Sequence, residues 1–386
     1  MEANRILSGQ KTTIFTVMSA LAVEHGAINL GQGFPDGEGP EDLRAAAAGY
    51  IMSGPNQYPP MAGMPALRQA VAQHDRRFYG IDADWQTEIL VTSGATEALT
   101  ASFMGLLNPG DDVVLIEPVY DSYRPIIETM GAQVRTVRLE PPQWSLPIDD
   151  LAAAFSPKTK LLVLNTPLNP IGKVFSRQEL QVIAELVVEN DAYVICDEVY
   201  EHLVFQGHQH IPIMTLPGMD DRCARIGSAG KTFSVTGWKV GYVTARPDML
   251  TAIAKAHQFI TFATPPALQL AVADGLAKDD RYYQDLACSL QERRNFLSAG
   301  LSDMGFDVLP CHGTYFLTAD FRALGFDGDD MDFCRHITTQ AGVAAVPISA
   351  FYGDPKQAPN NFVRFCFCKE KTVLADAVDR LRQHFG

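Results

Sequence analysis

The order of hydrophobic and polar residues along this chain predicts strands and helices that alternate. The clearest helix covers residues 176–190, where Ser176 and Glu179 have the spacing of a capping box and apolar residues then recur at helical intervals. Short apolar segments at 161–164 and 194–196 flank this helix and are predicted to be strands. A strand, a helix and a second strand in this order favour a parallel pair, so a ligand site is expected at the carboxyl ends of these strands.

The same pattern predicts two domains, for which a chain of 386 residues is long enough. Residues 46–280 alternate between strands and helices, and we assign them to a large α/β domain. After about residue 280 the pattern becomes α+β, and we assign residues 281–386 to a smaller domain, to which an N-terminal arm, residues 1–45, returns. The elements expected there are a helix at 283–304, strands at 306–309, 314–318 and 361–367, and a final helix at 371–384.

Composition narrows the possible partners. A formal charge of −14 opposes binding to nucleic acid or to an anionic membrane, and no membrane-spanning apolar run is present. The seven cysteines contain no Cys-x-x-Cys pair and the N-terminus lacks a basic and then apolar signal, which favours a cytoplasmic location. His208 and His210 could face one side of an extended segment, but no third ligand is near, so we predict no metal site.

The most informative segment for chemistry is 228–239. Lys231 lies between small residues that let its amine reach a bound carbonyl, while the Ser228 hydroxyl and the second cation, Lys239, suit a phosphate. Together they suggest a cofactor aldehyde held as a Schiff base. A nucleotide-binding P-loop is excluded, because the glycine required six positions before the lysine is replaced by Arg225.

This segment resembles the Ser-x-x-Lys and Gly-Trp-(Arg/Lys) signature of the class I aminotransferases of pyridoxal-phosphate fold type I. The resemblance implies that Lys231 carries pyridoxal 5′-phosphate as a covalent aldimine, and that Ser228 and Lys239 hold its phosphate. Lys239 stands where many relatives have arginine, and the run Gly-Trp-Lys-Val-Gly-Tyr looks most like the kynurenine, glutamine and methionine aminotransferase branch. The implied fold is a mostly parallel seven-stranded sheet between helices, with a smaller α+β domain.

A second motif, 165–172, resembles the family loop Asn-x-Pro-x-Asn-Pro-(Thr)-Gly, with Ile171 in place of the usual threonine. The Asn169 amide can donate a hydrogen bond to the 3-oxygen of the pyridine ring, and the prolines on either side restrict the loop. The resemblance therefore implies that Asn169 contacts both cofactor and substrate. Taken alone, the segment would be an ordinary turn between a strand and a helix.

A third motif ends the apolar strand at 193–197. A carboxylate against the pyridine nitrogen keeps that nitrogen protonated, and Asp197 matches the family position for this role. Tyr200 matches the tyrosine that bonds the ring oxygen. Glu198 is the rival carboxylate, but alternation along a strand points the two side chains in opposite directions, so we favour Asp197.

Two more motifs bind anions in the family. Gly94, Ala95 and Thr96 open a predicted helix that runs to residue 107 after a strand at 88–91, and backbone N–H groups at a helix N-terminus suit a phosphate. Arg364 lies in the predicted strand 361–367, and its planar fork can bind the substrate α-carboxylate through two parallel hydrogen bonds.

Three further matches are less specific. The segment 30–36 is not a dinucleotide fingerprint, because Asp36 replaces the last glycine, and it resembles the family loop whose Gly33 faces the substrate carboxylate. Tyr58 matches a residue that reaches the phosphate of the neighbouring subunit's cofactor, which implies a homodimer with shared active sites. Tyr120 falls where an aromatic ring stacks on the pyridine face, or alternatively packs in the core.

The activity that the resemblance implies is transamination. Lys231, displaced from the cofactor by the substrate amine, would move a proton between the substrate Cα and the cofactor as a free amine. The first half-reaction would release a 2-oxo acid, and a second 2-oxo acid would then react through the same steps in reverse. No motif supplies a second arginine for a side-chain carboxylate, and Phe15, Phe34 and Phe262 are expected near the substrate. We therefore predict a large uncharged donor, such as methionine, an aromatic amino acid, kynurenine or glutamine; the alternative is that these rings belong to the ordinary core.

Other functions stay open at this point. A cysteine-conjugate β-lyase uses the same lysine and carbanion, and no motif excludes it. A succinyldiaminopimelate aminotransferase would need a cation that the motifs do not supply. A cofactor-binding regulator would need an attached DNA-binding domain, and we expect the roughly 30 residues before Gly31 to be too few for one.

Overall fold

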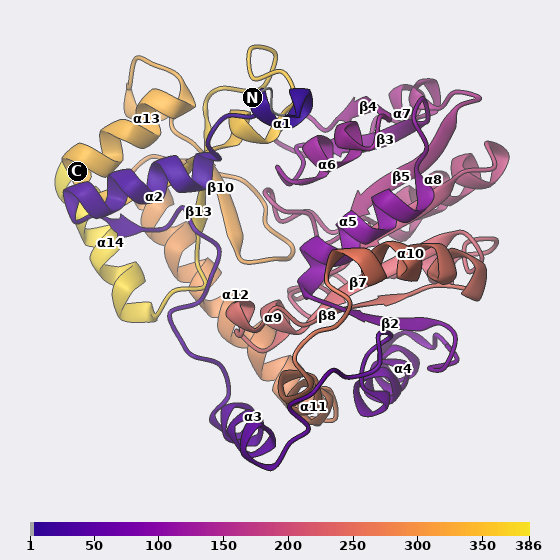
Figure 1. Ribbon diagram of the computed structural model, residues 1–386. Helices are drawn as coiled ribbons and strands as arrows, with labels where there is room; N and C mark the ends of the chain where they lie inside the picture. Colours follow the sequence, from indigo (N-terminus) through magenta and orange to yellow (C-terminus); the bar gives the residue numbers. More distant parts are fainter. Residues whose placement is uncertain (1–3) are drawn as a thin grey trace.

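The computed structural model describes residues 4–386. Its main feature is a seven-stranded sheet in the order β2-β8-β7-β6-β5-β3-β4, with helices on both faces (Figure 1). Neighbouring strands from β7 to β4 are parallel, and β8 runs antiparallel to both of its neighbours, β2 and β7. The strands are β2 (Ile89–Thr92), β3 (Asp112–Glu117), β4 (Gln133–Arg138), β5 (Thr159–Asn165), β6 (Tyr193–Asp197), β7 (Cys223–Ser228) and β8 (Gly241–Thr244). The predicted fold class is confirmed.

Helices cover both faces of this sheet, so its strands are buried along nearly their whole length, except for the edge strand β4. The helices are α3 (Glu41–Ser53), α4 (Pro65–Tyr79), α5 (Gly94–Leu106), α6 (Tyr123–Thr129), α7 (Ile148–Ala154), α8 (Arg177–Glu189), α9 (Ala229–Thr232), α10 (Pro247–Ile260) and α11 (Pro266–Leu276). Apolar residues of α5, α6 and α10 pack against one face of the sheet, and those of α7 and α8 pack against the opposite face. The predicted capping box is present at the start of α8, where Ser176 and Glu179 bond each other's backbone N–H groups.

A four-stranded antiparallel sheet, in the order β12-β13-β10-β9, lies on the other side of the molecule (left in Figure 1). Its strands are β9 (Asp307–Val308), β10 (Phe316–Asp320), β12 (Val346–Pro347) and β13 (Phe362–Cys366). β1 (Ile28–Asn29) pairs in parallel with β11 (Val343–Ala344), so the N-terminal segment lies beside the C-terminal part of the chain. The surrounding helices are α2 (Ile14–His25), α12 (Asp280–Asp303), α13 (Asp330–His336) and α14 (Lys371–Phe385), whereas the short helix α1 (Arg5–Ser8) contacts α6.

Two predicted strands have different bounds in the structure. The strand predicted at 306–309 forms only over β9, and the one predicted at 314–318 begins at Phe316. Thr314 has φ +66°, a left-handed backbone conformation that a strand does not accommodate. The pairing of β1 with β11 is what a returning N-terminal arm requires, and the boundaries 1–45, 46–280 and 281–386 stay predictions.

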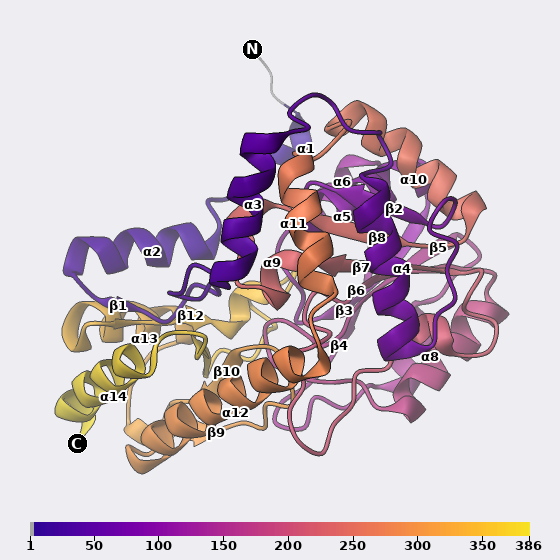
Figure 2. The same cartoon turned by 90° about the horizontal axis from the view of Figure 1, so that it is seen from below.

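The long helix α12 connects the two sheets. It begins near the end of α11 and runs to β9, an edge strand of the small sheet (Figure 2). Across residues 4–386, no helix has the length and apolarity needed to cross a membrane. The predicted cytoplasmic location stays a prediction.

Candidate active site

A cavity of about 370 Å³ opens at the carboxyl edge of the large sheet. Asn165, Asp197 and Ser228 are the last residues of β5, β6 and β7, and all three line it. β13 and the loop after β1 close its other side through Arg364 and Gly33. The predicted site residues that line the cavity are Phe15, Gly33, Phe34, Gly94, Ala95, Thr96, Tyr120, Asn169, Asp197, Tyr200, Ser228, Lys231, Lys239 and Arg364.

Two predicted site residues, Tyr58 and Phe262, lie outside this cavity. Tyr58 is 87% exposed, and Phe262 is 40% exposed. Their rings contact each other edge to face, with centroids 5.6 Å apart. Phe262 follows the end of α10 with φ +64°, so the chain turns there and the ring packs on Tyr58. Phe262 therefore does not line the cavity of its own chain, and its predicted contact with substrate stays a prediction.

Lys231 lies on the short helix α9, directly after β7. Ser228 is the N-cap of this helix, and its Oγ accepts a hydrogen bond from Gly230 N (3.2 Å). Lys231 Nζ donates to Tyr315 Oη (2.9 Å), and Tyr315 Oη donates to the Gly33 carbonyl (2.7 Å). Burial lowers the pKa of Lys231 below its usual value, because the ammonium loses its hydration. The arrangement gives a positioned amine that releases its proton more readily than a surface lysine.

Asp197 ends β6 with a buried carboxylate. Burial raises its pKa, and two hydrogen bonds oppose this effect: Tyr123 Oη donates to Oδ2 (2.5 Å), and Val199 N donates to Oδ1 (3.3 Å). A buried carboxylate of this kind is stabilised by a cationic partner. The protonated nitrogen of a pyridine ring fits this requirement.

Asn165 links the ends of two parallel strands. Its Nδ2 donates to the Asp197 carbonyl (2.8 Å), and its Oδ1 accepts from Asn169 N (2.9 Å). The Asn169 side chain is thereby held at the cavity wall, where its Oδ1 accepts from Arg364 Nη1 (2.9 Å). The loop 165–172 thus connects the Asp197 strand to the arginine of the small sheet.

Arg364 is a fully buried cation without a carboxylate partner among residues 4–386. Its Nη2 donates to the Gly31 carbonyl (2.6 Å), its Nε has no protein partner, and its guanidinium lies 3.9 Å from the Phe316 ring centroid. Burial lowers its pKa to about 10. A buried guanidinium with an unused donor is suited to binding a carboxylate ligand.

The opposite end of the cavity has the features of a phosphate site. α5 begins at Gly94, where a Cβ would lie only 3.2 Å from Lys239 Nζ, so the Lys239 amine lies close to the helix N-terminus. Ser228 and Thr236 also line this end. Backbone N–H groups, hydroxyls and an ammonium are the donors that bind phosphate in proteins.

Tyr120 and Tyr200 add two buried phenols. Burial raises the pKa of Tyr120 to about 12 and raises that of Tyr200 as well, so both rings stay neutral at physiological pH. Lys231 Nζ lies 5.5 Å from the Tyr200 ring centroid. Gly33 is required on the facing loop, because a Cβ there would lie 2.5 Å from Phe316 Cζ.

A family model described as aminotransferase class I and II matches residues 25–381. The chain belongs to this aminotransferase family. Enzymes of the family depend on pyridoxal phosphate, and the donor set at both ends of the cavity fits that cofactor. The predicted recognition is confirmed, and the protein is a pyridoxal-phosphate-dependent transaminase.

Individual relatives differ in their substrates. The aminotransferase is 46% identical, over 96% of its own length and 95% of the relative's, to a probable N-succinyldiaminopimelate aminotransferase of Mycobacterium tuberculosis. It is 38% identical, over 96% and 93%, to a kynurenine–oxoglutarate transaminase of Dictyostelium discoideum. The crystal structure of YbdL from Escherichia coli, identified with a methionine aminotransferase function, superimposes with a TM-score of 0.96 at 41% identity, covering 99% of this chain and 100% of that one.

Several residues in or beside the cavity of the aminotransferase were not anticipated from its sequence. Tyr123, Tyr315 and Phe316 lie in segments without a motif, and their contacts depend on the tertiary fold. Asn165 could have been found, because it is the polar residue directly after an apolar strand and the first residue of the Asn169 loop. Gln32 lines the cavity beside Gly33, and its Nε2 donates to Ser19 Oγ (2.5 Å).

Glu198 points away from the cavity, as strand alternation predicted. Its Oε2 accepts from Arg225 Nε (2.6 Å) and lies 2.9 Å from His210 Nε2, on the opposite face of the sheet. Arg225 also donates to Asp75 (2.6 Å) and to Glu201, so one buried guanidinium joins three carboxylates. This cluster anchors β6 and β7, the strands that position Asp197 and the Lys231 helix.

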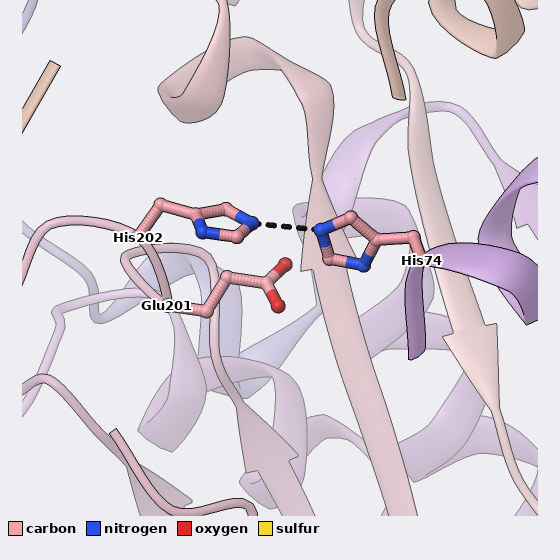
Figure 3. A group of neighbouring side chains, drawn as sticks. All are labelled: His74, Glu201 and His202. Carbon is pink, nitrogen blue, oxygen red and sulfur yellow. Dashed lines mark hydrogen bonds between the residues drawn. The ribbon is translucent and has the colours of Figure 1, made fainter. Parts of the chain in front are cut away.

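His208 and His210, which could have faced one side of an extended segment, contact different partners. His210 faces Glu198, and His208 stacks on His312 at 3.8 Å. A different group, His74, Glu201 and His202, brings its ligand-type atoms within 4.8 Å of one another (Figure 3). His74 Nε2 and His202 Nε2 lie 2.7 Å apart and share a hydrogen bond, and Glu201 is paired with Arg225.

We expect the His202 imidazole to make the stability of the enzyme depend on pH. Burial lowers its pKa from 6.5 to about 3, so the folded enzyme keeps it neutral where an unfolded chain protonates it. The contribution of the neutral imidazole to the free energy of unfolding is fully present above pH 6.5. It falls by about 1.4 kcal/mol for each pH unit between pH 6.5 and the lowered pKa of about 3. Unfolding free energies measured across this range should therefore show wild type losing more stability on acidification than His202→Gln. Exposed His25→Gln is the control and should follow wild type, and parallel curves for wild type and His202→Gln would contradict this prediction.

Proposed function

We propose that this transaminase moves the amino group of a large uncharged amino acid to a 2-oxo acid, with the cofactor attached to Lys231. The observation that carries the proposal is the buried Arg364, which has an unused Nε donor and no carboxylate partner in residues 4–386, in the same cavity as Lys231. An amino acid that places its carboxylate on Arg364 brings its amine and Cα into this cavity. The site therefore supports chemistry at Cα.

The cavity residues can be grouped by the part of the cofactor that each would contact. The N-terminus of α5 at Gly94, Ala95 and Thr96 would hold the phosphate together with Ser228 and Lys239. Asn169 and Tyr200 would bond the ring oxygen, and Tyr120 would cover the ring face. When bound, pyridoxal phosphate supplies an electron sink for the charge left at the substrate Cα.

The protein's own side chains would bind the substrate and move its proton. Arg364, held by Asn169, would bind the α-carboxylate. Lys231 has a lowered pKa and a fixed hydrogen bond to Tyr315, so its free amine would take the proton from Cα. Asp197, bonded by Tyr123, would hold a proton on the ring nitrogen.

The preference for an uncharged side chain rests on the other residues of the cavity. Its cations among the described residues are Lys231, Lys239 and Arg364, and each already has a role. Phe15 and Phe34 line the substrate end, with Phe34 45% exposed at the surface. Burial of a methionine or phenylalanine side chain contributes roughly 1.5 to 3 kcal/mol, enough for about a ten- to hundredfold preference over alanine.

A second candidate is a succinyldiaminopimelate-type aminotransferase. The 46% identity to the relative of that name favours it. Such a substrate carries further carboxylates, which would need cations beyond the three that line this chain's cavity. A cysteine-conjugate β-lyase is the third candidate, because it uses the same lysine, and release of pyruvate and ammonia would identify it.

We expect Lys231→Ala to abolish turnover while the cofactor still binds without a covalent link, because phosphate and ring contacts come from other residues. Borohydride reduction and peptide mapping of wild type should place the label on Lys231. Lys239→Ala is the matched control, since it should keep the label on Lys231 but weaken cofactor affinity. A label on any other lysine would refute the assignment.

We expect kcat/KM to be higher for methionine, phenylalanine and kynurenine than for aspartate or succinyldiaminopimelate. The physical reason is that Phe15 and Phe34 give the cavity an apolar wall, whereas every cation that lines the cavity already has another proposed role. The measurement is the half-reaction of each donor followed by the cofactor spectrum. If aspartate or succinyldiaminopimelate is preferred, a cation outside this chain's cavity contributes, and the proposed donor class is wrong.

We also expect a homodimer in which Tyr58 reaches the neighbouring active site. Tyr58 and Phe262 expose a joined aromatic surface, and Phe259 is 80% exposed on the same helix end. Sedimentation of the cofactor-loaded enzyme should give one species near twice 42.3 kDa. A fully active monomer would contradict the shared site.

A further inference from the structure

Two buried thiols lie in contact beside the proposed active site. Cys366 Sγ and Cys368 Sγ are 3.1 Å apart, and the residues are 0% and 1% exposed. Arg364 and Cys366 lie on one side of β13, because alternate residues of an extended strand face the same way, and Cys368 follows two residues after the end of this strand. All seven cysteines are free thiols, and no other two of them share a hydrogen bond within residues 4–386.

The surroundings make one of these thiols a better nucleophile than an ordinary buried cysteine. Burial alone would raise the pKa of Cys366, but the hydrogen bond from Cys368 and the charges of Arg364 and Lys369 outweigh it and lower this pKa. Burial and the neighbouring sulfur raise the pKa of Cys368. Cys366 is therefore the more acidic of the two thiols, and the 3.1 Å separation places the Cys368 sulfur within reach of it.

We infer that Cys366 and Cys368 form a redox-active pair that a peroxide converts reversibly into a disulfide. The Cys366 sulfur attacks one peroxide oxygen, the O–O bond breaks, and the sulfur becomes a sulfenic acid while hydroxide leaves. The Cys368 sulfur then attacks this sulfenic acid, an S–S bond forms, and water leaves. In total, two thiols and one hydrogen peroxide give one disulfide and two waters, with two electrons passing from sulfur to oxygen.

The position of the pair makes such a disulfide easy to reduce. Residues two apart on an extended strand have Cα atoms roughly 6.6 Å apart, near the upper limit of about 6.8 Å for a disulfide. Closing the bond must therefore tighten the backbone from Cys366 to Cys368. Strained disulfides are the more oxidising and labile ones, which suits a reversible modification.

Tightening at this point would reach the catalytic lysine through the backbone. Cys366 N donates to the Leu30 carbonyl (2.7 Å), and Phe367 N donates to the Tyr315 carbonyl (2.9 Å). Tyr315 in turn accepts the hydrogen bond of Lys231. A change in the backbone at 366–368 thus shifts both the loop before Gly33 and the partner of the Lys231 amine.

The chemical test uses the cofactor-loaded, reduced enzyme and needs no assumption about its substrate. We would treat it with a few equivalents of hydrogen peroxide, alkylate free thiols under denaturing conditions and map the tryptic peptides. Residues 365–369 form one such peptide, since Arg364 and Lys369 bound it. We expect this peptide to lose two hydrogens and to take no alkyl label, and dithiothreitol to restore both labels.

The functional test, which rests on the proposed transaminase activity, compares each protein with its own reduced form. Oxidation of wild type should lower activity between about tenfold and a hundredfold, the cost of a misplacement of roughly 1 Å at a reacting centre, and dithiothreitol should reverse the loss. Cys368→Ser should lack the reversible loss, and Cys288→Ser, which removes an exposed cysteine, should keep it.

Three results would overturn the inference. The first is full alkylation of both cysteines after peroxide treatment. The second is oxidation that adds oxygen to Cys366 without forming the bond to Cys368. The third is a dithiothreitol-reversible loss of activity that persists in Cys368→Ser or disappears in Cys288→Ser. Failure of the transaminase proposal alone would leave the disulfide in the peptide map intact, so the two failures are distinguishable.

Discussion

The buried guanidinium of Arg225 fixes the part of the fold on which the site depends. It joins Asp75 of α4 to Glu198 and Glu201, which follow β6, and it belongs to β7 itself. Removal of one partner from such a cluster leaves uncompensated buried charge and typically costs about 3 to 5 kcal/mol. Because β6 ends at Asp197, the ions on one face of the sheet determine the position of the carboxylate on the other face.

The cavity shows how a mostly parallel sheet gathers polar groups from distant parts of the sequence. Three neighbouring strands end in Asn165, Asp197 and Ser228, and their carboxyl ends share one edge of the sheet. The antiparallel sheet contributes Arg364 from the other side, and Asn169 hydrogen-bonds to it across the cavity. Anion-binding groups therefore lie at two ends, with the lysine between them, which suits a ligand that carries a phosphate at one end and a carboxylate at the other.

The sequence was sufficient for those parts of the site that local patterns encode. Alternation along β6 separated Asp197 from Glu198, and the structure confirms that the two side chains point in opposite directions. Tyr315 and Tyr123 were not predicted, because each meets its partner through tertiary packing with no local signal. Phe262 lies outside its own chain's cavity, because the chain turns at its left-handed backbone after α10 and the ring packs on Tyr58, a contact that no local pattern predicts. The hydrophobic periodicity predicted the helices well. The position at which a strand ends, as near Thr314, depends instead on a single backbone torsion.

Lys239 illustrates how charge and backbone geometry can conflict at one position. Its φ of +53° is a left-handed conformation, in which glycine would be free of strain and a β-branched residue would be strongly disfavoured. A lysine there costs conformational energy in every folded molecule, whether or not an anion is bound. Substitutions that relax this backbone would remove the cation, so selection for thermal stability and selection for anion affinity act on this residue in opposite directions.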